Sequence, residues 1–139
     1  MAGFEHLPKP QLTARHFGAR CLPVLTDESL FGATGVRIAF TGREGGVSKP
    51  PFDTLNLGDH VDDDSAAVAQ NRSLLLEAMG ALQVPLVVPK QVHGDVVVTI
   101  DEASPSALEG AVRHAQAGAD ALVVSVPQVA ALLCFADCV

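Results

Sequence analysis

The chain has 139 residues, of which 48% are apolar and 18% charged, and its formal net charge is −7. This length and apolar content suffice for a folded domain with a core and exclude a disordered chain. The negative charge, without any cluster of lysine and arginine, argues against nucleic acid or an acidic membrane surface as the partner. No apolar run approaches the roughly 20 residues that span a bilayer, and no signal peptide is recognisable.

The cysteines indicate a reducing compartment. There are three, an odd number, and they show no regular spacing, so we expect free thiols and a cytoplasmic protein. On one strand Cys134 and Cys138 would lie about 13 Å apart, because a strand rises ~3.3 Å per residue. That distance is too long for a disulfide.

The N-terminal part of the sequence is weakly patterned. We expect residues 1–33 to form an N-terminal extension and residues 34–139 to form the core. Residues 22–25 would form a short edge strand. Apolar residues alternate with smaller or polar ones over residues 35–41, which predicts the first well-defined strand.

A glycine-rich loop follows at residues 42–48, with the sequence Gly-Arg-Glu-Gly-Gly-Val-Ser. Glycine lets the backbone approach a ligand closely, and free N–H groups in such a loop can bind an anion. A loop of this kind is more often a plain surface turn, so both interpretations stay open at this point.

A helix is predicted over residues 65–79, where apolar residues recur on one stripe. Asp64 or Ser65 is expected to cap its N-terminus, and Gly80 fits the position just after its end. Arg72 lies in the middle of this helix and is expected on the solvated face.

His93 lies in a polar turn between two short apolar runs, residues 86–88 and 96–98. This pattern places the histidine at the end of a strand, where rigid strands often hold functional side chains. Residues 101–118 predict a loop with one irregular helical turn at residues 107–115. Two further strands are expected at residues 120–126 and 129–135, the last of them buried because it is apolar on both faces.

An imidazole and a thiolate are both good zinc ligands, so His93 and Cys138 form a candidate metal site. Each residue alone is more often structural. The rival chemistry is nucleophilic, with His93 as the base and Cys138 as the nucleophile. Four other residues offer a third zinc ligand, and spacing selects none of them: His60, His114, Cys134 and Asp137.

Six motifs occur in one order along the sequence, at residues 43–48, 55–64, 71–72, 91–94, 118–121 and 136–138. Together they resemble the YfiH family, long catalogued as polyphenol oxidase or laccase-domain proteins. The resemblance implies a four-layer α/β fold, with a layered mixed sheet and packed helices, of which this chain holds the N-terminal portion. It also implies a zinc-dependent purine nucleoside phosphorylase. Such enzymes split inosine, guanosine, adenosine and methylthioadenosine with phosphate, and they deaminate adenosine.

The resemblance also suggests roles for individual residues. By position, His93 and Cys138 match the zinc-binding, catalytic histidine and cysteine of the family. The loop at residues 43–48 lines the family's pocket, which makes Arg43 and Ser48 candidates for contacts with the nucleoside or phosphate. Weaker candidates for the same role are Asn56 and Gln91.

The sequence departs from the family in one important respect. The family's third zinc ligand lies in a His-Ala-Gly-Trp-Arg-Gly motif after the cysteine, and this sequence has no tryptophan. We therefore expect the third ligand beyond residue 139 and a core that is incomplete at its C-terminus. Two alternatives stay open: a copper-dependent polyphenol oxidase, which five histidines without a His-x-His pair disfavour, and a catalytically inactive truncated fragment that acts by binding. The oligomeric state is open.

Overall fold

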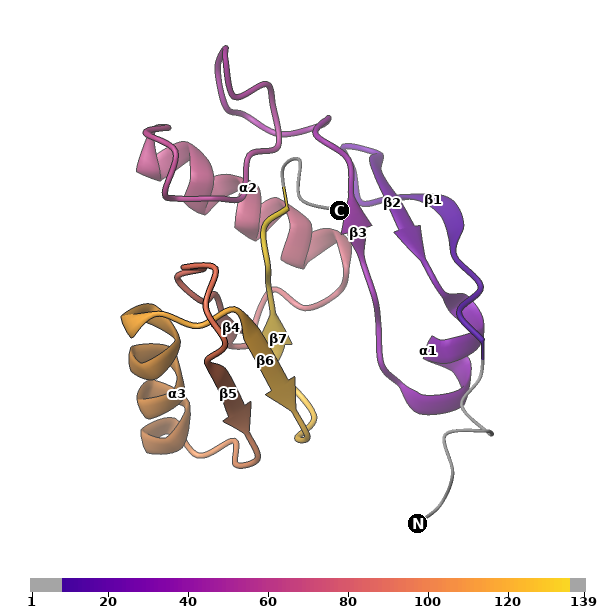
Figure 1. Ribbon diagram of the computed structural model, residues 1–139. Helices are drawn as coiled ribbons and strands as arrows, with labels where there is room; N and C mark the ends of the chain where they lie inside the picture. The colour runs from indigo at the N-terminus through magenta and orange to yellow at the C-terminus, as the bar shows by residue number, and fades with distance from the viewer. Residues whose placement is uncertain (1–8, 136–139) are drawn as a thin grey trace. The chain divides into compact units, whose positions relative to one another are not determined.

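The computed structural model describes residues 9–135 and divides the chain into two compact units (Figure 1). The first unit ends at Leu82 and the second begins at Gln83. The described residues form three helices and three small sheets, which confirms the predicted α/β class. None of the helices in this described part is long and apolar enough to cross a membrane.

The first unit contains an antiparallel sheet of three strands in the order β1 (Thr13–Phe17), β2 (Leu22–Thr26), β3 (Phe40–Thr41). Strand β2 therefore lies at the centre, and the prediction of an edge strand at residues 22–25 is wrong. Proline is tolerated there because β3 pairs only with Val24 and Leu25, so no ladder hydrogen bond requires the missing N–H of Pro23.

Strand β3 is shorter than the strand predicted over residues 35–41. The preceding helix α1 (Glu28–Thr34) ends at Gly35, whose φ of 76° suits glycine. Arg37 then turns toward this helix. Its Nη1 donates to Glu28 Oε1 at 2.8 Å, and its guanidinium carbon lies 3.7 Å from the ring centroid of Phe31. The local contacts of Arg37 thus replace strand pairing at this point of the chain.

Helix α2 (Ser65–Ala78) has the predicted position and ends. Asp64 is the N-cap and accepts the Ala66 N–H at 2.9 Å, while Gly80 follows the helix with a φ of 69°. Arg72 does not lie on a solvated face: its Nε donates to the Leu57 carbonyl at 2.8 Å, and its side chain is 19% exposed. The prediction for Arg72 was wrong because it considered the helix without the loops that pack on it.

The second unit is built from parallel strand pairs. Strand β5 (Val97–Ile100) pairs with β6 (Ala121–Val124) through helix α3 (Pro105–Ala117), which forms a β-α-β unit. Strand β4 (Leu86–Val87) pairs with β7 (Ala130–Ala131). The strands predicted on both sides of His93 and after residue 120 are thus confirmed.

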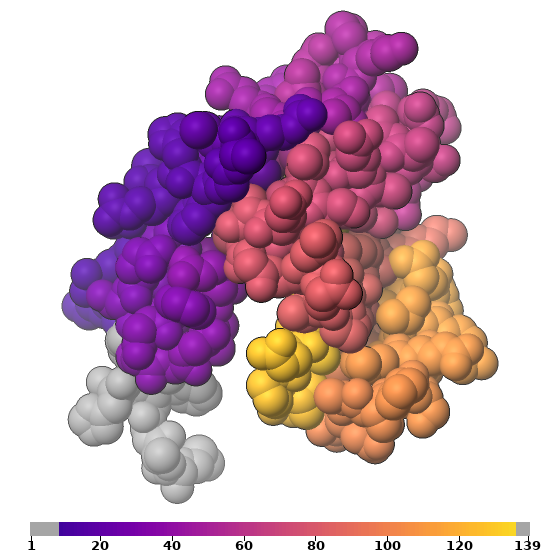
Figure 2. All heavy atoms as spheres, turned by 180° about the vertical axis from the view of Figure 1, so that it is seen from behind, coloured from indigo at the N-terminus to yellow at the C-terminus, as the bar shows by residue number. Residues whose placement is uncertain are grey.

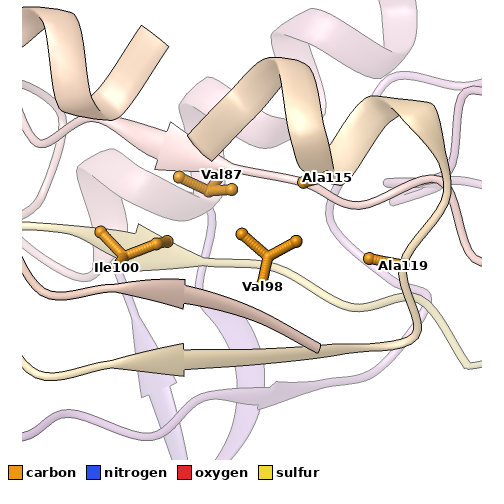
Figure 3. Packing of buried hydrophobic residues seen from close by; sticks show 5 residues of the cluster. All are labelled: Val87, Val98, Ile100, Ala115 and Ala119. Atoms are coloured by element: carbon orange, nitrogen blue, oxygen red, sulfur yellow. The ribbon is translucent and has the colours of Figure 1, made fainter. Parts of the chain in front are cut away.

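Helix α3 corrects the prediction of a loop with one irregular turn. Ser104 precedes it as N-cap and Pro105 occupies the first helical position, where a missing N–H costs nothing. One side of the helix packs on the strands and the other lies at the surface (Figure 2). The core of the unit gathers five buried residues from strands, helix and loop (Figure 3): Val87, Val98, Ile100, Ala115 and Ala119.

The last predicted strand, at residues 129–135, is reduced to the two residues of β7. None of the residues 129–135 is buried, and Phe135 is 57% exposed. The prediction of a long buried strand is wrong because β7 pairs with β4, which is itself only two residues long.

Candidate functional site

The backbone of the glycine-rich loop is occupied by internal hydrogen bonds. The N–H groups of Gly46, Val47 and Ser48 donate to Thr54 Oγ1, Asn71 Oδ1 and the Thr54 carbonyl, at 3.1, 2.8 and 2.8 Å. These three groups are therefore not free to bind an anion, and that part of the sequence interpretation is wrong. The loop is a rigid support for its side chains.

Arg43, in this loop, is held at both its backbone and its side chain. Its carbonyl accepts the N–H groups of Thr54 and Leu55 at 2.7 and 2.8 Å, and its Nε donates to the Asp53 carbonyl at 2.8 Å. The side chain is exposed, and its two terminal nitrogens make no hydrogen bond to any of residues 9–135. A guanidinium oriented in this way presents a fork of donors that suits phosphate.

Ser48 and Asn56 lie in a polar network beneath the loop. The Ser48 hydroxyl, in a residue that is 4% exposed, donates to Asp63 Oδ2 at 2.6 Å, and Asn56 Nδ2 donates to the same oxygen at 3.0 Å. These two hydrogen bonds, that from Ser48 first, hold the pKa of the Asp63 carboxyl below its ordinary value. Asn71 Nδ2 completes the network by donating to Ser48 Oγ at 2.9 Å.

His93, in the second unit, lies in an exposed turn that is fixed by a carboxylate. Its backbone has a φ of 57°, and Asp120 accepts the N–H groups of Val92, His93 and Gly94 at 2.9, 2.8 and 2.7 Å. These bonds, that from Gly94 first, lower the pKa of Asp120. Asp120 thus sets the direction in which the imidazole of His93 leaves the backbone.

Gln91 connects this turn to the end of the described chain. Its Oε1 accepts the backbone N–H of Cys134 at 2.9 Å, in the segment that follows β7. Cys138 lies four positions further along and, like Asp137, falls outside the described residues. The described contact therefore brings the backbone of the Cys134 segment to the histidine turn.

The described residues do not by themselves form a metal site. No three histidine, cysteine or acidic side chains gather within residues 9–135 in a way that would hold a metal ion. His60, His114 and Cys134 therefore do not complete a site with His93 inside this part of the chain. One imidazole on a fixed turn nevertheless fits the donor chemistry of zinc.

Two functional candidates were missed from the sequence, Asn71 and Asp120. Both belong to motifs noted there, the Asn-Arg pair and the Gly-Ala-Asp-Ala segment, but neither has a local signal for its partners. Asn71 contacts residues more than 14 positions away, and Asp120 contacts a turn 26 to 28 positions away. Only the folded structure shows these contacts.

Curated relatives of this chain carry a common name. A purine nucleoside phosphorylase of Mycobacterium tuberculosis is 46% identical over 104 residues, which are 75% of this chain and 38% of that protein. One of Corynebacterium glutamicum is 41% identical over 104 residues, which are 75% of this chain and 40% of that protein. The chain thus spans well under half the length of these relatives.

Two solved structures are also similar to this chain in sequence and fold. YlmD from Geobacillus stearothermophilus is 32% identical, with a TM-score of 0.66 over 89% of this chain and 46% of that one. The hypothetical protein YfiH of Bacillus licheniformis is 29% identical, with a TM-score of 0.63 over 83% of this chain and 42% of that one. The family described as multi-copper polyphenol oxidoreductase laccase matches residues 37–139. The chain therefore belongs to this laccase-like family, to which the YfiH proteins belong, as its six motifs had suggested.

Proposed function

We propose that the protein is a purine nucleoside phosphorylase that transfers the ribosyl group of a nucleoside to phosphate. The observation that carries this proposal is Arg43, whose carbonyl and Nε are fixed while its terminal nitrogens are exposed. The names of the curated relatives support the reaction class. Inosine, guanosine, adenosine and methylthioadenosine are the proposed nucleosides. The free thiol of Cys21 supports a cytoplasmic location.

Arg43 would act on the phosphate. In phosphorolysis the bond between C1′ of the ribose and the purine nitrogen breaks, and phosphate attacks C1′ as positive charge develops on the sugar. A fixed guanidinium holds the phosphate by two charge-assisted hydrogen bonds and limits its motion before the attack. Ser48 and Asn56 would contribute by supporting the loop that carries Arg43. Gln91 would contribute by joining the turn at His93 to the segment at Cys134.

His93 and Cys138 are the proposed ligands of a zinc ion, and no third ligand is assigned among residues 9–135. Zinc supplies Lewis acidity and, for a deamination of adenosine, a water of lowered pKa. The chain's own contribution is to fix His93 in its turn through Asp120. Adenosine deamination is the proposed side activity.

The test measures release of free base from inosine and adenosine by the purified chain, with and without phosphate and zinc. Release is expected to require both. Arg43→Ala is expected to raise the KM for phosphate about 10- to 100-fold, because charged hydrogen bonds contribute about 1.5–3 kcal/mol. Arg37→Ala is the matched control, since Arg37 is bound to Glu28.

Three results would contradict the proposal. Base release without phosphate would indicate hydrolysis, and an unchanged KM in Arg43→Ala would remove the phosphate role of Arg43. His93→Ala with full zinc content and turnover would remove the metal site. Copper content with oxidation of a diphenol would instead favour the polyphenol oxidase that the family's description names. Binding of nucleoside without turnover would favour the inactive fragment.

A further inference from the structure

Asn71 occupies the centre of the first unit's polar network. It is 0% exposed, and it lies on α2 between the glycine-rich loop and the segment of residues 53–56. Its Nδ2 donates to the carbonyls of Thr54 and Asn56 at 3.2 and 2.8 Å, and its Oδ1 accepts the Val47 N–H at 2.8 Å. One planar amide thus binds both segments at once.

Arg43 depends on the same segment of residues 53–56. Its carbonyl accepts the N–H groups of Thr54 and Leu55, and its Nε donates to the carbonyl of Asp53. A continuous path of hydrogen bonds therefore runs from Asn71 through the Thr54 backbone to Arg43. The path starts on a helix of 14 residues, which gives it a rigid origin.

The site accepts few substitutes for asparagine. The position needs a donor for two carbonyls and the Ser48 hydroxyl, and an acceptor for one N–H, within a space closed to water. Aspartate has no donor, and leucine has neither group. The backbone also lies close: a Cβ on Gly46 would come within 2.6 Å of Asn71 Oδ1.

We infer that Asn71 is a positioning residue for Arg43, which it orients through the backbone of residues 53–56. The use of Arg43 as a phosphate ligand rests on the proposed function, but the orientation of its side chain does not. Asn71 is itself fully buried, so its effect on a ligand would pass through the residues that it holds. Its loss therefore disorders a guanidinium more than 25 residues away in the sequence, while the helix that carries it remains folded.

The experiment observes the Nε–H group of Arg43 by ¹⁵N NMR in the full 139-residue chain. The signal is assigned by its loss in Arg43→Lys. In the wild type we expect a single sharp signal that exchanges slowly with water. In Asn71→Ala we expect exchange at least about tenfold faster and, in a titration with inorganic phosphate, a dissociation constant raised about tenfold.

The matched control is Gln70→Ala, which removes an exposed side-chain amide from the adjacent position of α2. Circular dichroism and amide exchange of α2 show whether each variant keeps the fold. A folded Asn71→Ala with an unchanged Arg43 signal would overturn the inference. If Asn71→Ala changes the Arg43 signal but the wild-type protein does not bind phosphate, the inference is supported and the proposed function is contradicted.

If Asn71→Ala does not fold, proton exchange in the wild-type protein alone still tests the inference. The inference requires that the Nδ2 protons of Asn71 and the Nε proton of Arg43 are both protected from exchange, because they lie on one hydrogen-bonded path. Exchange of the Arg43 proton at the rate of a free arginine, with Asn71 protected, would refute the orientation. Protection of both protons would support it.

Discussion

The carboxylate of Asp120 holds three consecutive residues of the turn at His93. Both of its oxygens take part, Oδ1 with Val92 and His93 and Oδ2 with Gly94. A non-glycine residue with a φ of 57° is uncommon, and here the carboxylate compensates for that conformation. The position of a proposed metal ligand thus depends on the carboxylate of a different residue.

Asp120→Asn is expected to loosen this turn, because an amide has one acceptor oxygen where the carboxylate has two. Exchange of the Val92–Gly94 amide protons should accelerate, and zinc affinity, measured by competition with a coloured chelator, should fall about tenfold. Asp95→Asn, an exposed change in the same loop, is the control. Unchanged exchange and affinity in Asp120→Asn would show that the turn holds its shape without the carboxylate.

Helix α2 serves as the platform for two loops of the first unit. Its adjacent residues Asn71 and Arg72 bind different segments, one the backbone around Thr54 and the other the Leu57 carbonyl. The helix begins at the Asp64 cap and ends before Gly80. A change that destabilises the first turn of α2 should therefore also loosen the two loops that are bonded to this helix.

Asp64→Ala is expected to lower the free energy of unfolding by about 1 kcal/mol, because the Ala66 N–H loses its partner. Asp64→Asn keeps a cap oxygen and should stay close to the wild type. Urea unfolding followed by circular dichroism measures both variants. Equal losses in the two variants would mean that the carboxylate charge matters and the cap hydrogen bond does not.

Element by element, the sequence predicts what local chemistry determines. Helix α2 was predicted because its apolar stripe, cap and final glycine all agree. Helix α3 was missed because its many alanine, serine and glycine residues are also typical of a loop, although Leu108, Ala111 and Ala115 recur at helical spacing and pack against the core. The lengths of β3 and β7 depend on their partner strands, which no local pattern reveals.

The candidate site shows the same limit. His93 was placed correctly in a turn between strands, since two short apolar runs enclose it. Arg43 became a candidate through the resemblance to the family. Anion binding by the loop's N–H groups was one of two open interpretations, and Thr54 and Asn71 occupy three of those groups. A polar residue in mid-helix resembles a solvated one, so the burial of Asn71 had no signal in the sequence.

At the scale of the whole molecule, acid should weaken the fold through buried or bonded carboxylates. Hydrogen bonds from the backbone of Gln11 and then Leu30 lower the pKa of Asp27, and those from Ser48 and then Asn56 lower the pKa of Asp63. Their ordinary value is 3.8, so the unfolded chain takes up these protons first as the pH falls. Their stabilisation is complete well above pH 3.8 and is lost as the pH drops through the lower folded values.

The free energy of unfolding should therefore be steady near neutral pH and decline from about pH 5 downward. Urea unfolding at successive pH values measures this decline. Asp27→Asn and Asp63→Asn should each make it shallower, while exposed Asp62→Asn should leave its slope alone. A slope that stays the same in all three variants would place the acid sensitivity in other groups.

The parallel pairing of β4 with β7 also has a consequence for the order in which the protein is made. Leu86 pairs with Ala130, so β4 leaves the ribosome long before its partner exists. The turn at His93 must likewise wait for Asp120, and Gln91 for the segment at Cys134. The first unit has its own sheet and helix platform and can fold early during synthesis. Translation thus delivers Arg43 and its supporting loop first, and the turn at His93 gains all its contacts only when the segment at Cys134 has been made.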